Sequence, residues 1–97
     1  MRVFISLPMT GRPTESIREE LARIQAALAA QGHTTSDGLE TEDAGAQVNW
    51  PLWCLGSSLR RLAGCDAAYF AEGWQRSKGC AMEHEACRLY EIPILQD

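Results

Sequence analysis

Short apolar runs alternate along this chain with longer segments in which apolar side chains recur at helical spacing. The first run, Val3-Phe4-Ile5-Ser6-Leu7, is typical of a strand that is buried on both faces. The predicted strands are residues 3–7, 33–36, 67–71 and 92–95. The predicted helices lie between residues 14 and 32, 49 and 64, and 77 and 90. Because strands that alternate with helices form a parallel sheet with right-handed crossovers, we predict an α/β protein with a small parallel sheet.

Capping residues set the expected helix ends. Thr14 or Ser16 is the expected N-cap of the first helix, and Gly32 ends it. Asn49 followed by Trp50-Pro51 is typical of the cap and first turn of the second helix. The first apolar stripe is Ile17, Leu21, Ile24 and Leu28, and the second is Leu52, Leu55, Leu59 and Leu62.

The size and charge of the chain limit the possible functions. Its 97 residues correspond to one domain, residues 1–97, with a core of modest size. Small α/β domains of this kind often oligomerise, because association buries further apolar surface. The formal net charge of −4, with scattered basic residues, argues against a nucleic-acid polymer as partner, whereas a small phosphorylated molecule needs only a local site. No run approaches the ~18 apolar residues of a membrane span, and no signal peptide is visible, so we expect a cytoplasmic protein without a membrane partner.

The cysteines indicate neither disulfides nor a metal site. The four cysteines show no Cys-x-x-Cys spacing and are most simply small buried hydrophobic residues. Cys80, His84 and Cys87 stand at i, i+4 and i+7, but a single helix rarely supplies a complete metal site. We therefore expect no metal and no cofactor.

The segment from Gly73 to Glu83 has the pattern of an anion site. It follows a predicted strand and opens a predicted helix, whose first backbone N–H groups and dipole favour a negative ligand. Glu83 shares a mostly apolar helical face with Gly79, Cys80, Ala86, Cys87 and Tyr90. A carboxylate on such a face is a candidate catalytic group. Two simpler readings stay open: Gly79 lets the helix start close to the sheet, and Glu83 lies at the edge of the buried stripe.

Two loops are expected to share one pocket. Residues 8–13 and 72–79 both follow the carboxyl ends of predicted strands, which is where parallel sheets bind ligands. Glu83 would face this pocket. The acidic segment 37–48 is predicted to be a long loop, of the kind that is usually functional or mobile.

Three sequence features resemble the nucleoside 2-deoxyribosyltransferase-like family, including its short bacterial and phage branch. The first strand runs into Ser6-Leu7-Pro8-Met9-Thr10-Gly11, close to the Ser-Gly-Pro-Met-Thr-Gly of that branch. Cys65-Asp66 precedes the middle strand, and Gly73 to Glu83 with Ile92-Pro93-Ile94 is a nearly complete match. The likeness covers almost the whole chain and implies a flavodoxin-like, three-layer α/β sandwich.

This resemblance implies specific roles for residues of the pocket. Glu83 would be the nucleophile that attacks the anomeric carbon of a 2-deoxyribose and displaces the base, after which water or another base resolves the glycosyl-enzyme. Ser77 and Gly79 would hold a 5′-phosphate. The expected binding residues are Ser6, Pro8, Met9, Gly11, Gly73, Trp74, Ser77 and Gly79. The resemblance also implies a homo-oligomer whose pocket lies near a subunit interface.

The chain departs from the family pattern at three positions. Phe4 stands where a tyrosine positions the glutamate, and Leu7 stands where a glycine leaves room beside the sugar. Ser58 stands where an aspartate assists the leaving base, and a serine is not an acid or base at neutral pH.

Three functions remain open from the sequence. The first is an N-glycosidase or deoxyribosyltransferase, weakened by the loss of the aspartate. The second is a non-catalytic module that binds a nucleotide or sugar phosphate. The third is an oligomeric interaction protein with a relict pocket, for which Trp50, Trp53 and Trp74 offer apolar contact surface.

Overall fold

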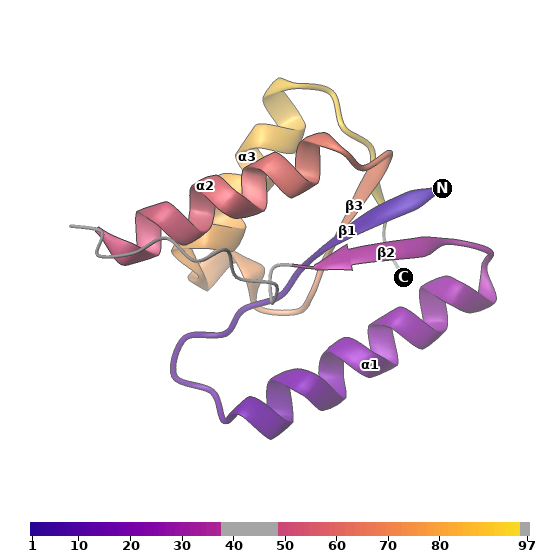
Figure 1. The fold of residues 1–97 in the computed structure, drawn as a ribbon, viewed down its shortest axis with the longest axis horizontal. Coiled ribbons are helices and arrows are strands. Elements are labelled where there is room, and N and C mark those ends of the chain that lie inside the picture. Colours follow the sequence, from indigo (N-terminus) through magenta and orange to yellow (C-terminus); the bar gives the residue numbers. More distant parts are fainter. Residues whose placement is uncertain (38–48, 96–97) are drawn as a thin grey trace.

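The computed structural model describes residues 1–37 and 49–95, and these form a three-layer α/β sandwich (Figure 1). The strands are β1 (Arg2–Ser6), β2 (Thr34–Asp37), β3 (Ala67–Phe70) and β4 (Ile94–Leu95). The helices are α1 (Thr14–Ala30), α2 (Trp50–Ala63), the short 3-10 helix η1 (Trp74–Arg76) and α3 (Lys78–Leu89). Most of the predicted loop 37–48 lies outside the described residues.

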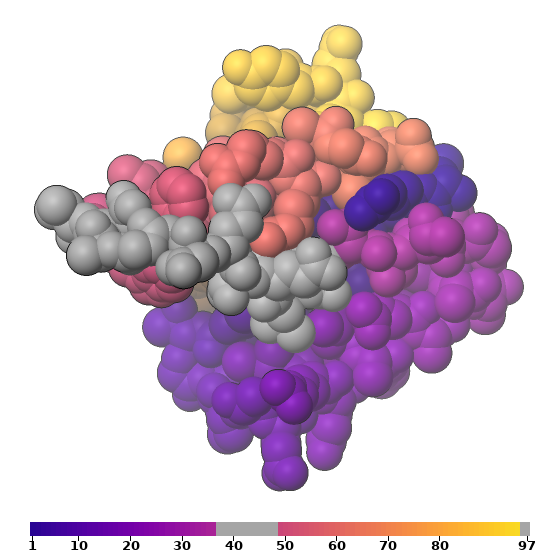
Figure 2. Space-filling view, viewed as in Figure 1, coloured from indigo at the N-terminus to yellow at the C-terminus, as the bar shows by residue number. Residues whose placement is uncertain are grey.

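All strand pairs of the described sheet are parallel, and the strand order is β2-β1-β3-β4. Helix α1 covers one face, and α2 and α3 cover the other (Figure 1). In the space-filling view, β2 is seen between these two helical layers (Figure 2). This order is that of the flavodoxin-like folds, so the predicted fold class is confirmed.

The sheet separates two apolar cores because successive residues of a strand point to opposite faces. Val3 and Ile5 pack with the stripe of α1, which is buried as predicted at Ile17, Leu21, Ile24 and Leu28. Phe4 points the other way and packs with Leu62 of α2 and Cys87 of α3. After β1 the chain adds β2 on one side and then β3 on the other, so the strand order reverses between β1 and β3. Parallel sheets bind ligands at such a reversal point.

The structure corrects the predicted cap of one helix and confirms that of another. Helix α1 begins at Thr14 with Pro13 as N-cap and no capping side chain, so the assignment of Thr14 or Ser16 was wrong. The reason is that Pro13 already has the extended backbone of a cap, while Ser16 Oγ accepts a hydrogen bond from Arg12. Asn49 caps α2 as predicted, since its Oδ1 accepts from the Leu52 N–H at 3.1 Å.

Two residues of the predicted apolar stripes are exposed. Leu52, in the first turn of α2, is 60% exposed, and Tyr90 is 79% exposed. Tyr90 falls beyond the last residue of α3, so its side chain does not continue the buried face of that helix. Pro93 directly precedes β4, which is an edge strand of the sheet.

The turn after α3 stores backbone strain at Glu91. Its φ of 59° is in the left-handed region, and the following Ile92 N–H donates to the Cys87 carbonyl at 2.9 Å, which closes the helix end. Glu91→Gly is expected to raise the free energy of unfolding by about 1 kcal/mol, because only glycine adopts this φ without a steric penalty. Urea denaturation measures the change. Glu91→Ala, which retains a Cβ, should leave stability nearly unchanged, and an equal gain in both variants would contradict the explanation.

Candidate active site

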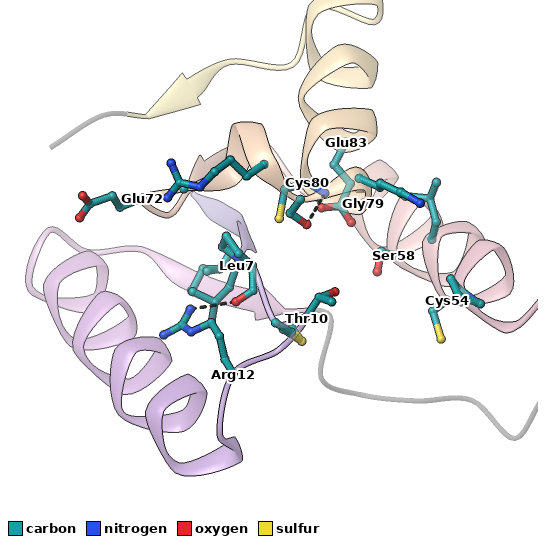
Figure 3. Close-up of a pocket in the computed structure, with 18 of the residues that line it drawn as sticks. Leu7, Thr10, Arg12, Cys54, Ser58, Glu72, Gly79, Cys80 and Glu83 are labelled. Atoms are coloured by element: carbon teal, nitrogen blue, oxygen red, sulfur yellow. Dashed lines mark hydrogen bonds between the residues drawn. The ribbon is translucent and has the colours of Figure 1, made fainter.

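A cavity of about 860 Å³ opens at the carboxyl ends of β1 and β3. Its volume is within the ~300–1,000 Å³ of typical small-molecule sites. The lining includes Leu7, Pro8 and Met9 after β1, Cys54, Leu55 and Ser58 of α2, and Gly73, Ser77, Gly79, Cys80 and Glu83 before and within α3. Figure 3 shows Gly79, Cys80 and Glu83 grouped on one side, with Ser58 and Cys54 of α2 nearby. The two loops predicted to share a pocket do so.

Glu83 is a buried carboxylate at the wall of this cavity. It is 6% exposed, and its Oε1 accepts a hydrogen bond from the Ser6 hydroxyl at 2.7 Å. Burial raises the pKa of Glu83, and the Ser6 and Ser58 hydroxyls oppose this rise without cancelling it. A carboxyl with a raised pKa in a cleft is a candidate functional group on physical grounds.

Helix α3 presents Glu83 to the cavity because of where the helix starts. Ser77 is its N-cap, and the Ser77 hydroxyl accepts from the Cys80 N–H at 3.4 Å. From this start, Cys80, Glu83 and Cys87 form the buried face of the helix. The interpretation that Glu83 lies merely at the edge of the buried stripe is therefore excluded.

The N-terminus of α3 forms part of the cavity wall. Helix geometry leaves the first N–H groups, those of Lys78 and Gly79, without a partner inside the helix. A Cβ placed on Gly79 would meet no heavy atom within 4 Å, so close packing does not require glycine there. The open space over Gly79 instead lets a ligand approach the backbone of the helix start.

Most of the predicted site residues meet at the cavity. Those that line it are Pro8, Met9, Ser58, Gly73, Ser77, Gly79 and Glu83. Ser6 is absent from the lining and reaches the site through its bond to Glu83. Gly11 and Trp74 are not part of the lining. The Trp74 ring stacks on the His84 ring, with 3.9 Å between centroids, and packs into the core on the α2–α3 side.

The departures from the family pattern have distinct surroundings. Phe4 of β1 is fully buried on the face of the sheet that α2 and α3 cover, and it also lines the cavity. Leu7 is 5% exposed and packs mainly into the core beneath α1. Ser58 lines the cavity close enough to Glu83 to lower the pKa of that carboxyl. Serine hydroxyls thus reach Glu83 from both β1 and α2.

Arg12 and Glu20 line the cavity but were not predicted from the sequence. Arg12 donates to the Pro8 carbonyl at 2.8 Å and forms an ion pair with Glu20 at 2.6 Å. These contacts fasten the loop 8–13 to α1. The sequence carries little signal for this pair, because it joins a loop residue to the second turn of a helix.

The thiols of α3 are buried beside Glu83. Burial raises the pKa of Cys80, and burial together with the negative charge of Glu83 raises the pKa of Cys87 to about 11. Both therefore remain protonated near neutral pH. Among the described residues, no group of three or more His, Cys, Asp or Glu side chains is arranged to hold a metal ion, and no helix is long and apolar enough to span a membrane.

The strand order and the position of the cavity at the carboxyl ends of β1 and β3 define a flavodoxin-like α/β domain. The solved structure of a 2-deoxyribosyltransferase from Bacillus psychrosaccharolyticus matches with a TM-score of 0.68 over 97% of this chain and 69% of that chain. That enzyme is described as a biocatalyst for the synthesis of antiviral and antitumoral nucleosides. At 15% sequence identity, this match establishes the fold.

The sequence also matches a family over nearly its full length. The family is described as a domain of unknown function, DUF4406, and the match spans residues 1–96. The chain belongs to this family. No curated protein sequence matches it.

Proposed function

We propose that this protein cleaves the N-glycosidic bond of a 2′-deoxynucleoside or its 5′-monophosphate, with Glu83 as nucleophile. The observation that carries the proposal is a buried carboxylate, hydrogen-bonded by Ser6, at the wall of a cavity beside a helix N-terminus. A desolvated carboxylate is suited to attack an oxocarbenium-like carbon because the developing charges are opposite and water is excluded.

The proposed reaction has two steps. A bond forms between C1′ and a carboxylate oxygen of Glu83 while the bond from C1′ to the base nitrogen breaks, and the base leaves with that electron pair and takes a proton from solvent. Water, or a second base, then attacks C1′ and releases the Glu83 carboxylate. Water gives hydrolysis, whereas a second base gives transfer.

The start of α3 supports a phosphorylated substrate. Ser77, Lys78 and Gly79 line the cavity, and the first N–H groups of the helix together with its dipole favour an anion there. Arg76 and Lys78 also line the cavity and add positive charge. We infer that a 5′-phosphate is held at this end and the sugar lies toward Glu83.

Ser58 favours a second candidate function, which is nucleotide binding without turnover. A serine hydroxyl hydrogen-bonds but does not deliver a proton to a leaving base at neutral pH. The loss of such a proton-transfer group typically lowers a rate by about two to four orders of magnitude. We therefore expect a slow enzyme. If the rate of base release falls to zero, the protein is a nucleotide-binding module.

Base release from a panel of 2′-deoxynucleosides and their monophosphates separates these candidates. Slow release of base, followed by chromatography, supports the enzyme. Thermal stabilisation by a nucleotide without release supports the binding module. Neither release nor stabilisation at millimolar nucleotide contradicts both, and leaves the interaction role.

Gly79→Ala is expected to separate nucleotide binding from stability. The added methyl group projects into open space over the start of α3, so the free energy of unfolding should rise by up to about 1 kcal/mol while nucleotide affinity falls. Isothermal titration calorimetry and urea denaturation measure the two effects. Gly56→Ala is the matched control, because Gly56 lies in α2 with the same open surroundings and outside the cavity lining. Equal nucleotide affinity in both variants would contradict the proposed phosphate position.

We further propose a cytoplasmic homo-oligomer. The cysteines at positions 54, 65, 80 and 87 are all free, as expected in a reducing compartment. Trp50 and Leu52 at the start of α2 are exposed apolar side chains close in sequence to the cavity residues Pro51 and Cys54. A second copy that covers them would shield the cavity. Light scattering coupled to size exclusion measures the mass, and a strict monomer would contradict this part.

A further inference from the structure

We propose that Ser6 is a positioning residue that holds Glu83 through its Oε1 atom and leaves Oε2 as the attacking oxygen. This inference rests on the proposed function for its kinetic consequence. Sequence reasoning assigned Ser6 to contact with the substrate. Its position instead indicates that it acts through the carboxylate.

Ser6 is too deeply buried to be a substrate contact. It is 1% exposed and is not part of the cavity lining. Its hydroxyl carries one proton, which it donates to Glu83 Oε1 at 2.7 Å. Because that proton and Oε1 are engaged with each other, Oε2 is the carboxylate oxygen that Ser6 leaves available to form the bond to C1′.

The donor lies on a central strand of the sheet. Ser6 is the last residue of β1, which is flanked by β2 and β3, and it pairs in register with Phe70. The Ser6 carbonyl accepts from the Ala71 N–H at 2.9 Å, which continues the pairing past the end of β3. Groups held on rigid strands orient a reacting side chain more accurately than groups on loops. The bond also joins residues 77 positions apart, and so ties α3 to the central strand.

The same bond favours the ionised form of Glu83. A buried carboxylate loses its hydration, and hydrogen bonds to the charged form are what compensate it. Of the two hydroxyls that lower the pKa of Glu83, Ser6 has the larger effect and Ser58 the smaller. Without Ser6, the carboxyl would bind its proton more tightly and would lose its fixed orientation.

The ionisable groups around Glu83 allow its titration to be recognised. On α3, the thiols of Cys80 and Cys87 have raised pKa values, partly because of the Glu83 charge, so they do not titrate on the acid side. Arg76 and Lys78 add positive charge at the cavity wall. The carboxylates of Glu20 and Glu72 also line the cavity, and Glu20 forms an ion pair with Arg12. The shift of the acid limb of the pH profile on Ser6→Ala, rather than the limb itself, therefore reports Glu83, because Ser6 donates its hydrogen bond to that carboxylate.

Ser6→Ala tests the proposal, with Ser57→Ala as the matched control. Ser57 is also a buried serine, at 4% exposure, but its hydroxyl has no hydrogen-bond partner among the described residues and it does not line the cavity. Ser6→Ala should lower kcat about ten- to a hundredfold, as expected for the loss of a charge-assisted hydrogen bond, with little change in KM. The acid limb of its pH profile should move to higher pH. Ser57→Ala should change none of these values.

A second readout does not require turnover. The carboxyl carbon of Glu83, followed by NMR in the ligand-free protein labelled with carbon-13 glutamate, should titrate at higher pH in Ser6→Ala than in the wild type. An inactive wild type that still shows this shift would overturn the proposed function and leave the Ser6–Glu83 coupling standing. A raised KM with unchanged kcat and an unchanged Glu83 titration would overturn the inference, because Ser6 would then contact the substrate.

Discussion

Glu83→Gln is expected to lower base release by about three orders of magnitude or more and, at the same time, to stabilise the folded protein at neutral pH. The catalytic loss follows because an amide is not a nucleophile toward C1′, and loss of a nucleophile removes most of an enzyme's rate enhancement. The gain in stability follows because the substitution removes a buried charge whose desolvation raises the pKa of Glu83. Chromatographic assay of the base and thermal denaturation measure the two effects.

The pH dependence of the stability difference has a definite sign. Since the pKa of Glu83 is raised in the folded state, the unfolded chain releases this proton first, and the folded state loses stability as pH rises from about 4.5 through the raised pKa. Below that window Glu83 is protonated and neutral in both states, so wild type and Glu83→Gln should be closest in stability there. At neutral pH the variant should be the more stable protein. A variant that is less stable at pH 7 would show that the carboxylate contributes to stability rather than to function.

Phe4→Ala is expected to cause a large loss of stability. Phe4 is fully buried on the central strand and packs between the sheet and the α2–α3 layer. Truncation of a buried phenylalanine costs about 3–5 kcal/mol, a large part of the ~5–15 kcal/mol that stabilises a typical domain. Urea denaturation should therefore show a midpoint at a markedly lower urea concentration than that of the wild type.

Leu52→Ala is the control for this prediction. Leu52 is also a large apolar residue, but it is 60% exposed at the start of α2. Its truncation should change the free energy of unfolding by about 0.5 kcal/mol or less. Comparable losses in the two variants would mean that the core is not organised around β1 as described.

Sequence patterns were sufficient for features that depend on local interactions. The Asn49 cap acts within one turn, and the buried face of α3 follows from helical periodicity, so both were predicted. Residues that line the cavity from the ends of β1 and β3 were predicted for a different reason. The carboxyl ends of parallel strands always meet at one edge of a sheet.

These sequence patterns could not predict contacts between residues that lie far apart in the chain. The Ser6–Glu83 bond depends on the relative placement of β1 and α3, and the Arg12–Glu20 pair on how a loop folds back on α1. Trp74 follows a strand end, as a ligand-binding residue would, yet its ring stacks on His84 because the 3-10 helix η1 turns it toward the core. Such orientations are decided by tertiary packing, which helical and strand periodicity do not encode.

Intact-mass spectrometry of the protein, quenched in acid during reaction with a 2′-deoxynucleoside 5′-monophosphate, tests the central claim most directly. If Glu83 is the nucleophile, the protein should gain the mass of one phosphorylated deoxyribosyl group, and peptide mapping should locate it on Glu83. The adduct should be missing from Glu83→Gln. Release of base at equal rates by wild type and Glu83→Gln, or an adduct on another residue such as Cys80, would contradict the account.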